Sequence, residues 1–142
     1  MASLANVFDA LGKRAEALKL REELLVLMKS KLGPEHPDTL ISMRILAFRY
    51  RASNCNTESC KLDEEILALM RAKLGSEHPD TFKAMAVLTE SYDGLGRFAE
   101  SLRLREELLT FQKSKLGVDH AETLATLSNV ANNYAALGLF QA

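Results

Sequence analysis

The sequence has few cysteines and no long apolar run. Its two cysteines, Cys55 and Cys60, are too few for a disulfide framework in 142 residues, so we expect reduced thiols. No run of about 20 apolar residues is present, which argues against a membrane-spanning helix. The N-terminus also lacks the charged and then apolar layout of a signal peptide. These absences predict a cytoplasmic protein.

Net charge is also nearly absent, because 18 basic side chains stand against 19 acidic ones. Proteins that bind nucleic acid or anionic membranes by electrostatics carry a basic surface. The balance here predicts that neither nucleic acid nor a membrane is a partner. The hydrophobic content of 47% is typical of a chain that folds and buries a core.

What the sequence does contain is an internal repeat with a period of 42 residues. All histidines and all tyrosines follow this period, at His36, His78, His120, Tyr50, Tyr92 and Tyr134. Such a period indicates stacked helical units, none of which can bury its apolar face alone. We therefore expect a single repeat domain over residues 1–142. Its units are expected at about 1–36, 37–78 and 79–120, with a partial unit at 121–142.

Each period contains two segments with helical periodicity, which we call A-type and B-type. In an A-type segment, Leu40, Met43, Leu46 and Tyr50 recur at steps of three and four residues and so share one helix face. B-type segments carry apolar residues on more than one stripe, which is typical of a helix packed on both sides. Strand-like alternation is absent from the sequence. We predict an all-α protein of about seven helices, at about 1–11, 15–32, 38–52, 57–74, 80–95, 99–116 and 122–137.

The ends of these helices are marked by proline and glycine. Pro37 and Pro79 suit a first helical turn, and the acid that follows each of them suits the positive end of the helix dipole. His-Pro-Asp also occurs in the loop with which J-domain co-chaperones stimulate an ATPase. Here it appears at 36–38 and again at 78–80, and this repetition favours a structural role. An active site needs different groups that converge, so we predict no catalytic residue and no enzyme.

The pattern resembles the tetratricopeptide repeat. Met43, Leu46, Ala47 and Tyr50 match the family's spacing of large, large, small and aromatic residues. The turn glycine and the later small residue of the family are matched by Gly12 with Ala17 and by Gly96 with Ser101. The usual repeat has about 34 residues, and this longer form is similar to the repeats of kinesin light chains and of bacterial sensor arrays.

The resemblance implies an α-solenoid of antiparallel helix pairs, wound as a right-handed superhelix. It also implies a protein-interaction scaffold that needs no cofactor and no metal. If A-type helices line a concave groove, as in that family, the positions that vary between repeats face a protein or peptide partner. The candidate groove residues are Asn6, Arg44, Phe48, Arg51, Lys83, Val87, Glu90, Ser128, Asn129 and Asn132. Arg44, Phe48 and Lys83 form the strongest patch, because guanidinium and aromatic groups dominate interface energetics. We expect this module to be part of a larger signalling or scaffold protein.

Some positions allow a second interpretation. Asp9, Arg51 and Asp93 occupy the same position in successive repeats and alternate in sign, so they could equally form a ladder of ion pairs between repeats. Asn54 replaces a turn glycine, which asparagine tolerates because it visits the left-handed region. Cys60 stands where other units have leucine, which favours a small core residue over a metal ligand.

The last B-type helix is missing from the pattern. In the final A-type helix, Leu124, Leu127, Val130 and Tyr134 occupy positions that a following B-type helix covers in earlier units. Either the chain is a piece of a longer array or another chain covers this face, because solenoid ends need capping. The second possibility predicts a structural module that self-assembles into a homo-oligomer through helix 122–137.

Overall fold

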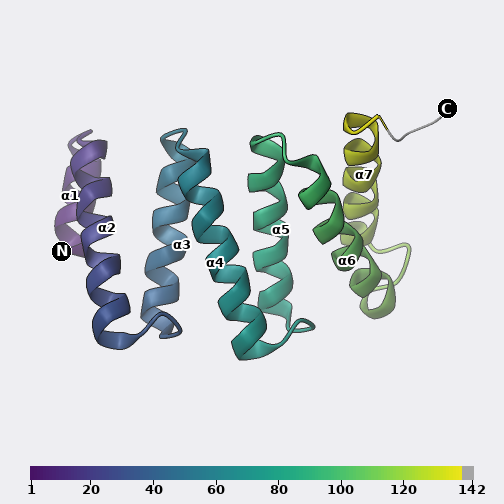
Figure 1. Ribbon diagram of the computed structural model, residues 1–142, viewed down its shortest axis with the longest axis horizontal. Coiled ribbons are helices and arrows are strands. Elements are labelled where there is room, and N and C mark those ends of the chain that lie inside the picture. Colours follow the sequence, from purple (N-terminus) through teal and green to yellow (C-terminus); the bar gives the residue numbers. More distant parts are fainter. Residues whose placement is uncertain (139–142) are drawn as a thin grey trace. The chain divides into compact units, whose positions relative to one another are not determined.

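The computed structural model describes residues 1–138. This part of the chain consists of helices joined by turns and short loops, and it contains no strand. The helices within it are α1 (Ala2–Ala10), α2 (Arg14–Leu32), α3 (Pro37–Ala52), α4 (Asn56–Leu74), α5 (Pro79–Gly94), α6 (Phe98–Lys115) and α7 (Ala121–Ala136), drawn in Figure 1. The predicted all-α class and the seven helices are confirmed for these residues. Each helix begins and ends within one residue of its predicted position.

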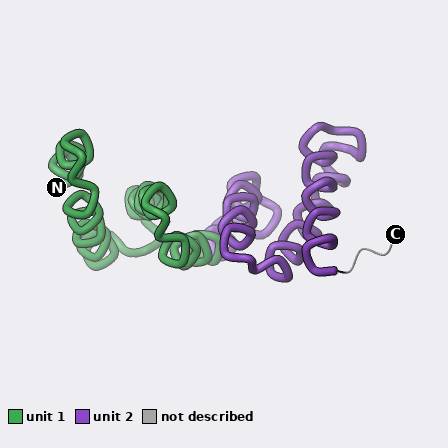
Figure 2. Tube along the Cα trace, turned by 90° about the horizontal axis from the view of Figure 1, so that it is seen from above, with its two compact units in different colours: residues 1–69 green, residues 70–142 purple. Residues whose placement is uncertain are grey.

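The chain divides into two compact units, Met1–Leu69 and Met70–Ala142, and the division falls within α4 (Figure 2). Unit 1 contains α1, α2, α3 and most of α4, and unit 2 contains the end of α4 with α5, α6 and α7. The single repeat domain and its repeat boundaries stay a prediction. Residues 139–142 of that predicted domain lie outside the described residues.

In each unit a B-type helix packs between two A-type helices. In unit 1, α2 contacts both α1 and α3, and in unit 2, α6 contacts both α5 and α7. Consecutive helices run antiparallel within each unit (Figure 1). This double packing explains why the B-type segments carry apolar residues on more than one stripe.

Small residues allow the paired helices to approach closely. Ala17, Ser59 and Ser101 share one register position and are completely buried. The Oγ atom of Ser59 donates a hydrogen bond to the carbonyl of Ala47 at 3.0 Å, and that of Ser101 donates to the carbonyl of Thr89 at 3.3 Å. The hydroxyl is therefore satisfied where serine replaces alanine in this contact.

The periodic histidines cap the A-type helices. The Nδ1 atom of His36 accepts the backbone N–H of Asp38 at 3.2 Å, and His78 does the same with Asp80 at 3.1 Å. His120 repeats the contact at the start of α7. Each helix thereby gains an acceptor for one of its free N-terminal N–H groups. The sequence pattern indicated that this histidine serves the fold, and the structure adds that its role is capping.

Two of the periodic tyrosines, Tyr50 and Tyr134, join an A-type helix to the preceding B-type helix. The hydroxyl of Tyr50 donates to the Glu22 carboxylate at 2.5 Å, and that of Tyr134 donates to Glu106. The pKa of Tyr50 is raised above its ordinary value, first by burial and then by the hydrogen bond to Glu22. The pKa of Tyr134 is raised by its hydrogen bond to Glu106. The neutral phenol is thus the form that this contact favours.

The turn at Asn54 in the irregular second repeat has the same backbone conformation as the equivalent turns of the other repeats. Asn54 has φ 61°, close to the φ of 74° at Gly12 and 71° at Gly96 in the corresponding turns. The predicted left-handed asparagine is therefore confirmed. Cys60 is 2% exposed, as expected for a small core residue.

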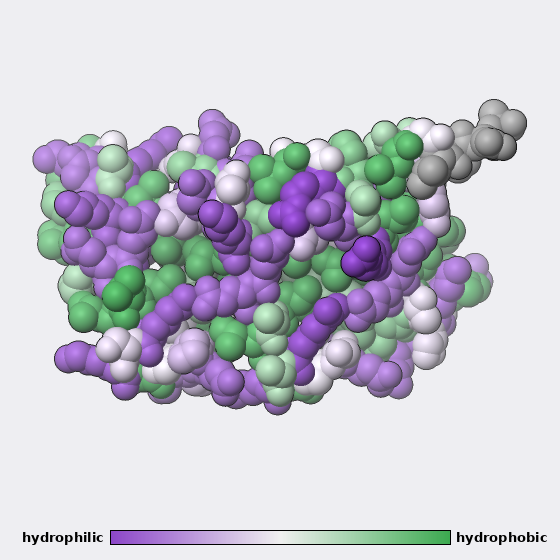
Figure 3. Space-filling model, viewed as in Figure 1, coloured by the Kyte–Doolittle hydropathy of each residue, from purple (hydrophilic) through white to green (hydrophobic). Residues whose placement is uncertain are grey.

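The surface is mixed in polarity. Figure 3 shows hydrophilic side chains interspersed with apolar ones over the face that it draws. Neighbouring B-type helices are linked by Lys29 with Glu65 at 2.7 Å in unit 1, and by Arg71 with Glu107 at 2.8 Å in unit 2. These half-exposed pairs contribute little individually, on the order of 1 kcal/mol or less.

Candidate functional site

One face of α3 in unit 1 exposes large apolar side chains. Ile41, Ile45 and Phe48 are 55%, 41% and 59% exposed, and Arg44 is exposed among them. These four residues, the α3 patch, follow the steps of three and four residues that keep side chains on one helix face. Arg44 and Phe48 were predicted from the sequence, whereas Ile41 was missed. The same helical spacing could have identified it.

The corresponding face of α5 in unit 2 is mixed in character. Lys83 and Glu90 are exposed, and Val87 is partly buried between them. The Lys83 ammonium lies 3.5 Å from the Asp80 carboxylate, an exposed pair in the first turn of α5. This face thus offers charges of both signs where α3 offers apolar area.

The same face of α7 is polar and uncharged. Ser128, Asn129 and Asn132 are all exposed there. In α1 the equivalent residue is Asn6, which is exposed but accepts a hydrogen bond from Arg21 at 2.7 Å. The predicted residues therefore occupy equivalent positions on one face of each A-type helix. The side chains at these positions differ in charge and polarity from repeat to repeat.

Arg51 lies in an ion pair with the B-type helix that follows it. Its guanidinium is 2.6 Å from the carboxylate of Asp63, which is 4% exposed, and it also donates to Ser59 at 3.2 Å. The residue at this position of the series thus pairs with the residue twelve positions later, in the B-type helix that follows it. The ladder of ion pairs between repeats stays a prediction.

The equivalent pairs in the other repeats carry the opposite arrangement of charge. Asp9 accepts from Arg21 at 2.9 Å, and Asp93 lies 2.6 Å from Arg105. Arg21 and Arg105 are buried, as Asp63 is. The buried member of the pair is therefore an arginine, an aspartate and an arginine in turn, and charge complementarity is kept each time. Asp9 has a second partner, Arg49 of α3, at 3.4 Å.

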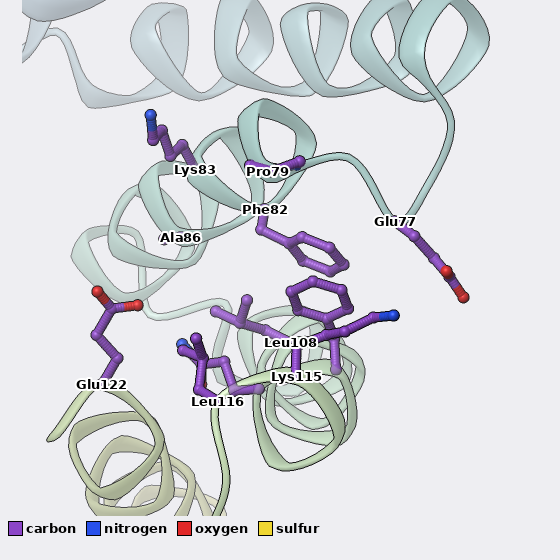
Figure 4. Close-up of a pocket in the computed structure, with 11 residues that line it drawn as sticks. Glu77, Pro79, Phe82, Lys83, Ala86, Leu108, Lys115, Leu116 and Glu122 are labelled. Atoms are coloured by element: carbon purple, nitrogen blue, oxygen red, sulfur yellow. The ribbon is translucent and has the colours of Figure 1, made fainter. Parts of the chain in front are cut away.

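Unit 2 contains a cleft of about 610 Å³ between α5, α6 and the start of α7 (Figure 4). Its aromatic wall is Phe82 stacked on Phe111, with ring centroids 3.5 Å apart and planes at 19°. Leu108 and Leu116 add apolar surface. Only Lys83 of this lining was a predicted site residue. The two phenylalanines stand where the other repeats have leucine, and this was the available signal.

The end face of α7 is only partly open. Leu124 and Leu127 are 50% and 45% exposed, as the missing B-type helix predicts. Val130, in contrast, is 6% exposed and packs with Leu102 and Leu109, and Tyr134 packs against the same cluster. The prediction that Val130 and Tyr134 are uncovered was wrong, because these positions face the preceding helix α6.

The part of the chain described by the structure lacks two other kinds of feature. No helix in residues 1–138 is both long and apolar enough to cross a membrane. The same residues bring no three side chains of the His, Cys, Asp or Glu type together as a metal site.

Comparison with known proteins identifies the class. The tetratricopeptide repeat family matches three consecutive stretches, residues 1–38, 39–80 and 81–122. The chain therefore belongs to the tetratricopeptide repeat family, whose fold is a non-enzymatic, protein-interaction scaffold type. The α-solenoid of antiparallel helix pairs expected from the sequence is confirmed. No curated protein matches the sequence.

The similar solved structures are kinesin-light-chain-like. Two structures of a Podosopora anserina putative kinesin light chain with nearly identical TPR-like repeats, one of them a point variant, are each 30% identical to this chain. They cover 97% and 96% of it, with TM-scores of 0.78 and 0.74. The chain spans 65% of the length of each. BtubC (BKLC) from P. vanneervenii shares the fold, with 18% identity over 95% of this chain and 54% of its own, at a TM-score of 0.73. The predicted long-repeat resemblance is thus confirmed.

Proposed function

We propose that this chain binds a peptide or protein segment in the groove formed by its A-type helices. The observation that supports the proposal is the α3 patch, in which three large apolar side chains are about half exposed around one arginine. Soluble proteins rarely leave contiguous apolar area in water unless it serves binding. Ile41, Ile45 and Phe48 have no counterpart of equal apolarity on the same face of α7, so packing of the repeat does not require them.

The chemistry of the α3 patch suggests the character of the partner. Phe48 offers a flat apolar surface, and Arg44 offers a guanidinium for a carboxylate or a carbonyl. Aromatic residues and arginine account for a large share of hot spots at protein interfaces. A partner segment with apolar side chains and an acidic residue would match both groups. We further propose that the chain acts in the cytoplasm as part of a larger signalling or scaffold protein, and that it has no catalytic activity.

Substitution of the α3 patch tests this proposal. A partner recovered by pull-down and mass spectrometry would be titrated calorimetrically against Arg44→Ala and Phe48→Ala. We expect each substitution to weaken binding about tenfold or more, because each removes a group of the hot-spot type. The matched control is Lys19→Ala, an exposed residue of the B-type helix α2, which should bind as the wild type does. Unchanged affinity in both α3 variants would remove the groove proposal.

A second candidate function is self-assembly through α7. Leu124 and Leu127 are 50% and 45% exposed, whereas the equivalent Leu40 and Met43 are 7% and 0% exposed. We propose that a second copy covers this face. Light scattering over a dilution series should then show an oligomer that Leu127→Glu dissociates. A wild type that stays monomeric at the highest concentration would contradict this candidate.

A further inference from the structure

One face of α1 exposes apolar side chains at positions that other A-type helices bury. Leu4, Val7 and Leu11 are 48%, 51% and 65% exposed, and steps of three and four residues place them on one side of the helix. We call these three residues the α1 end face. Leu46 and Leu88 hold the register position of Leu4, and each is 2% exposed. Packing between repeats covers this position in α3 and α5 but leaves it open in α1.

The α1 end face is the side on which a preceding helix would pack. Val130 of α7 holds the register position of Leu4, and it packs with Leu102 and Leu109 of α6. Helix α6 is the B-type helix that comes before α7 in the chain. The equivalent side chain of α1 therefore points toward the place of a helix that would come before it.

The exposed leucines of α7 lie on the opposite kind of side. Leu124 and Leu127 form what we call the α7 end face. Phe82 of α5 holds the register position of Leu124, and its ring stacks on that of Phe111 in α6, the B-type helix that comes after α5. The α7 end face is thus the side on which a following helix would pack. One end face precedes and the other follows, as the two facing sides of successive repeats do.

Neither end face carries a charge. Helix α1 contains one charged residue, Asp9, whose carboxylate lies 2.9 Å from Arg21, and α7 contains one, Glu122 in its first turn. Helices α3 and α5 each contain four charged residues. A charged partner surface would lose its hydration on these leucines and gain no counter-charge, so the end faces favour an apolar, uncharged partner.

The two end faces also lack a polar contact that joins A-type helices within unit 2. There, the side-chain amide of Asn133 in α7 donates to the Asp93 carboxylate of α5 at 3.1 Å. Val7 holds the register position of Asn133, and Ala135 holds that of Asp93. Val7 and Ala135 are both exposed. Both members of the contact are therefore apolar on α1 and α7, and burial of one face against the other leaves neither position with an unsatisfied polar group.

We propose that the α7 end face binds the α1 end face of a second copy of this chain. The contact joins two unlike faces, so each copy in a pair keeps one free face of each kind. Copies therefore add head to tail, and the assembly grows beyond a dimer as the concentration rises. This inference rests on the second candidate function, self-assembly through α7, and it names the surface that α7 contacts.

Two variants that each block one end face test this contact. Leu4→Glu and Leu127→Glu change side chains that are about half exposed in the single copy. Each should weaken self-association about a hundredfold, because the new carboxylate would be buried without a counter-charge. In sedimentation velocity we expect the wild type to exceed a dimer and each variant alone to be a monomer. Val26→Glu changes an apolar residue of α2 that is 66% exposed, and this control should assemble as the wild type does.

An equimolar mixture of the two variants should form a 1:1 dimer and nothing larger. Leu4→Glu keeps a free α7 end face and Leu127→Glu keeps a free α1 end face, so one head-to-tail contact remains. A mixture that stays monomeric would overturn the inference. Circular dichroism checks that each variant is helical, and Val7→Glu or Leu124→Glu replaces a variant that is not.

The single variants also separate this inference from self-assembly in general. If Leu4→Glu alone forms a dimer, α7 pairs with α7, so the inference fails and self-assembly through α7 stands. If Leu127→Glu alone forms a dimer, α1 pairs with α1 and both fail. A wild type that stays monomeric at the highest concentration would also overturn both.

Discussion

Reversing the charge of Arg105 alone, as Arg105→Asp, should lower the free energy of unfolding by about 3–5 kcal/mol. The double variant that exchanges the pair, Asp93→Arg with Arg105→Asp, should recover a large part of this loss. Arg105 is buried, and its guanidinium lies 2.6 Å from Asp93. An aspartate at position 105 would leave two carboxylates facing each other across the same contact, with no cation to compensate them.

Recovery in the double variant is expected because unit 1 already contains the exchanged arrangement. Arg51 occupies the position of Asp93, and its buried partner Asp63 occupies that of Arg105, at 2.6 Å. The two arrangements therefore fit the same helix pair. Asn133 adds to the network in unit 2, since it accepts from Arg105 and donates to Asp93 at 3.1 Å. Its amide can turn over to donate to a new aspartate at position 105.

The measurement is urea unfolding of the wild type, both single variants and the double variant, followed by circular dichroism. The control is Arg103→Asp, which reverses the charge of an exposed residue on the same helix and should change stability by less than about 0.5 kcal/mol. A double variant that is no more stable than Arg105→Asp would show that the pair contributes nothing through its complementary charge.

Truncation of Met85 to alanine should lower the free energy of unfolding by about 2–5 kcal/mol. Leu127→Ala should lower it by less than about 1 kcal/mol. The two residues hold the same register position in successive A-type helices. Met85 is 0% exposed, so its truncation leaves a cavity in the core of unit 2. Leu127 is 45% exposed, and water fills the space that its side chain leaves.

Denaturant titration at two protein concentrations checks this pair of variants. A cost for Leu127→Ala close to that of Met85→Ala would contradict the prediction for a single copy. If that cost appears only at the higher concentration, it would instead support assembly through α7, because association stabilises the folded state by mass action. The control is Lys83→Ala, which truncates an exposed residue of α5 and should change stability little.

The repeat pattern predicted most of the fold because helix faces and helix ends depend on residues that are close together in the sequence. Steps of three and four residues placed Met43, Leu46 and Ala47 on one buried face, and all three are at most 2% exposed. Proline and glycine predicted the helix ends because their backbone preferences act within one turn. The exposure of Arg44 and Phe48 could also be predicted from the sequence, since these positions vary where the core is constant.

Other features depend on which helix lies beside which. The sequence alone could not pair Arg51 with Asp63, because alternating charges at one position fit either a ladder along the A-type helices or separate pairs with the B-type helices. It could not assign Val130 to the core of unit 2, because that requires knowing that this position faces α6. The buried Oε1 of Gln112, which accepts no hydrogen bond within residues 1–138, is likewise invisible in the sequence, where a glutamine in a helix usually reaches water.

The sequence by itself determined the all-α class, the seven helices of residues 1–138 and the membership of the tetratricopeptide repeat family. These follow from periodicity and helix-end signals, which act over a few residues and are repeated every 42 positions. Only the tertiary structure decided which equivalent positions are buried, which charges pair and where an amide is left without a partner. Burial and hydrogen bonding depend on the neighbouring helix, and identical register positions meet different neighbours in different repeats.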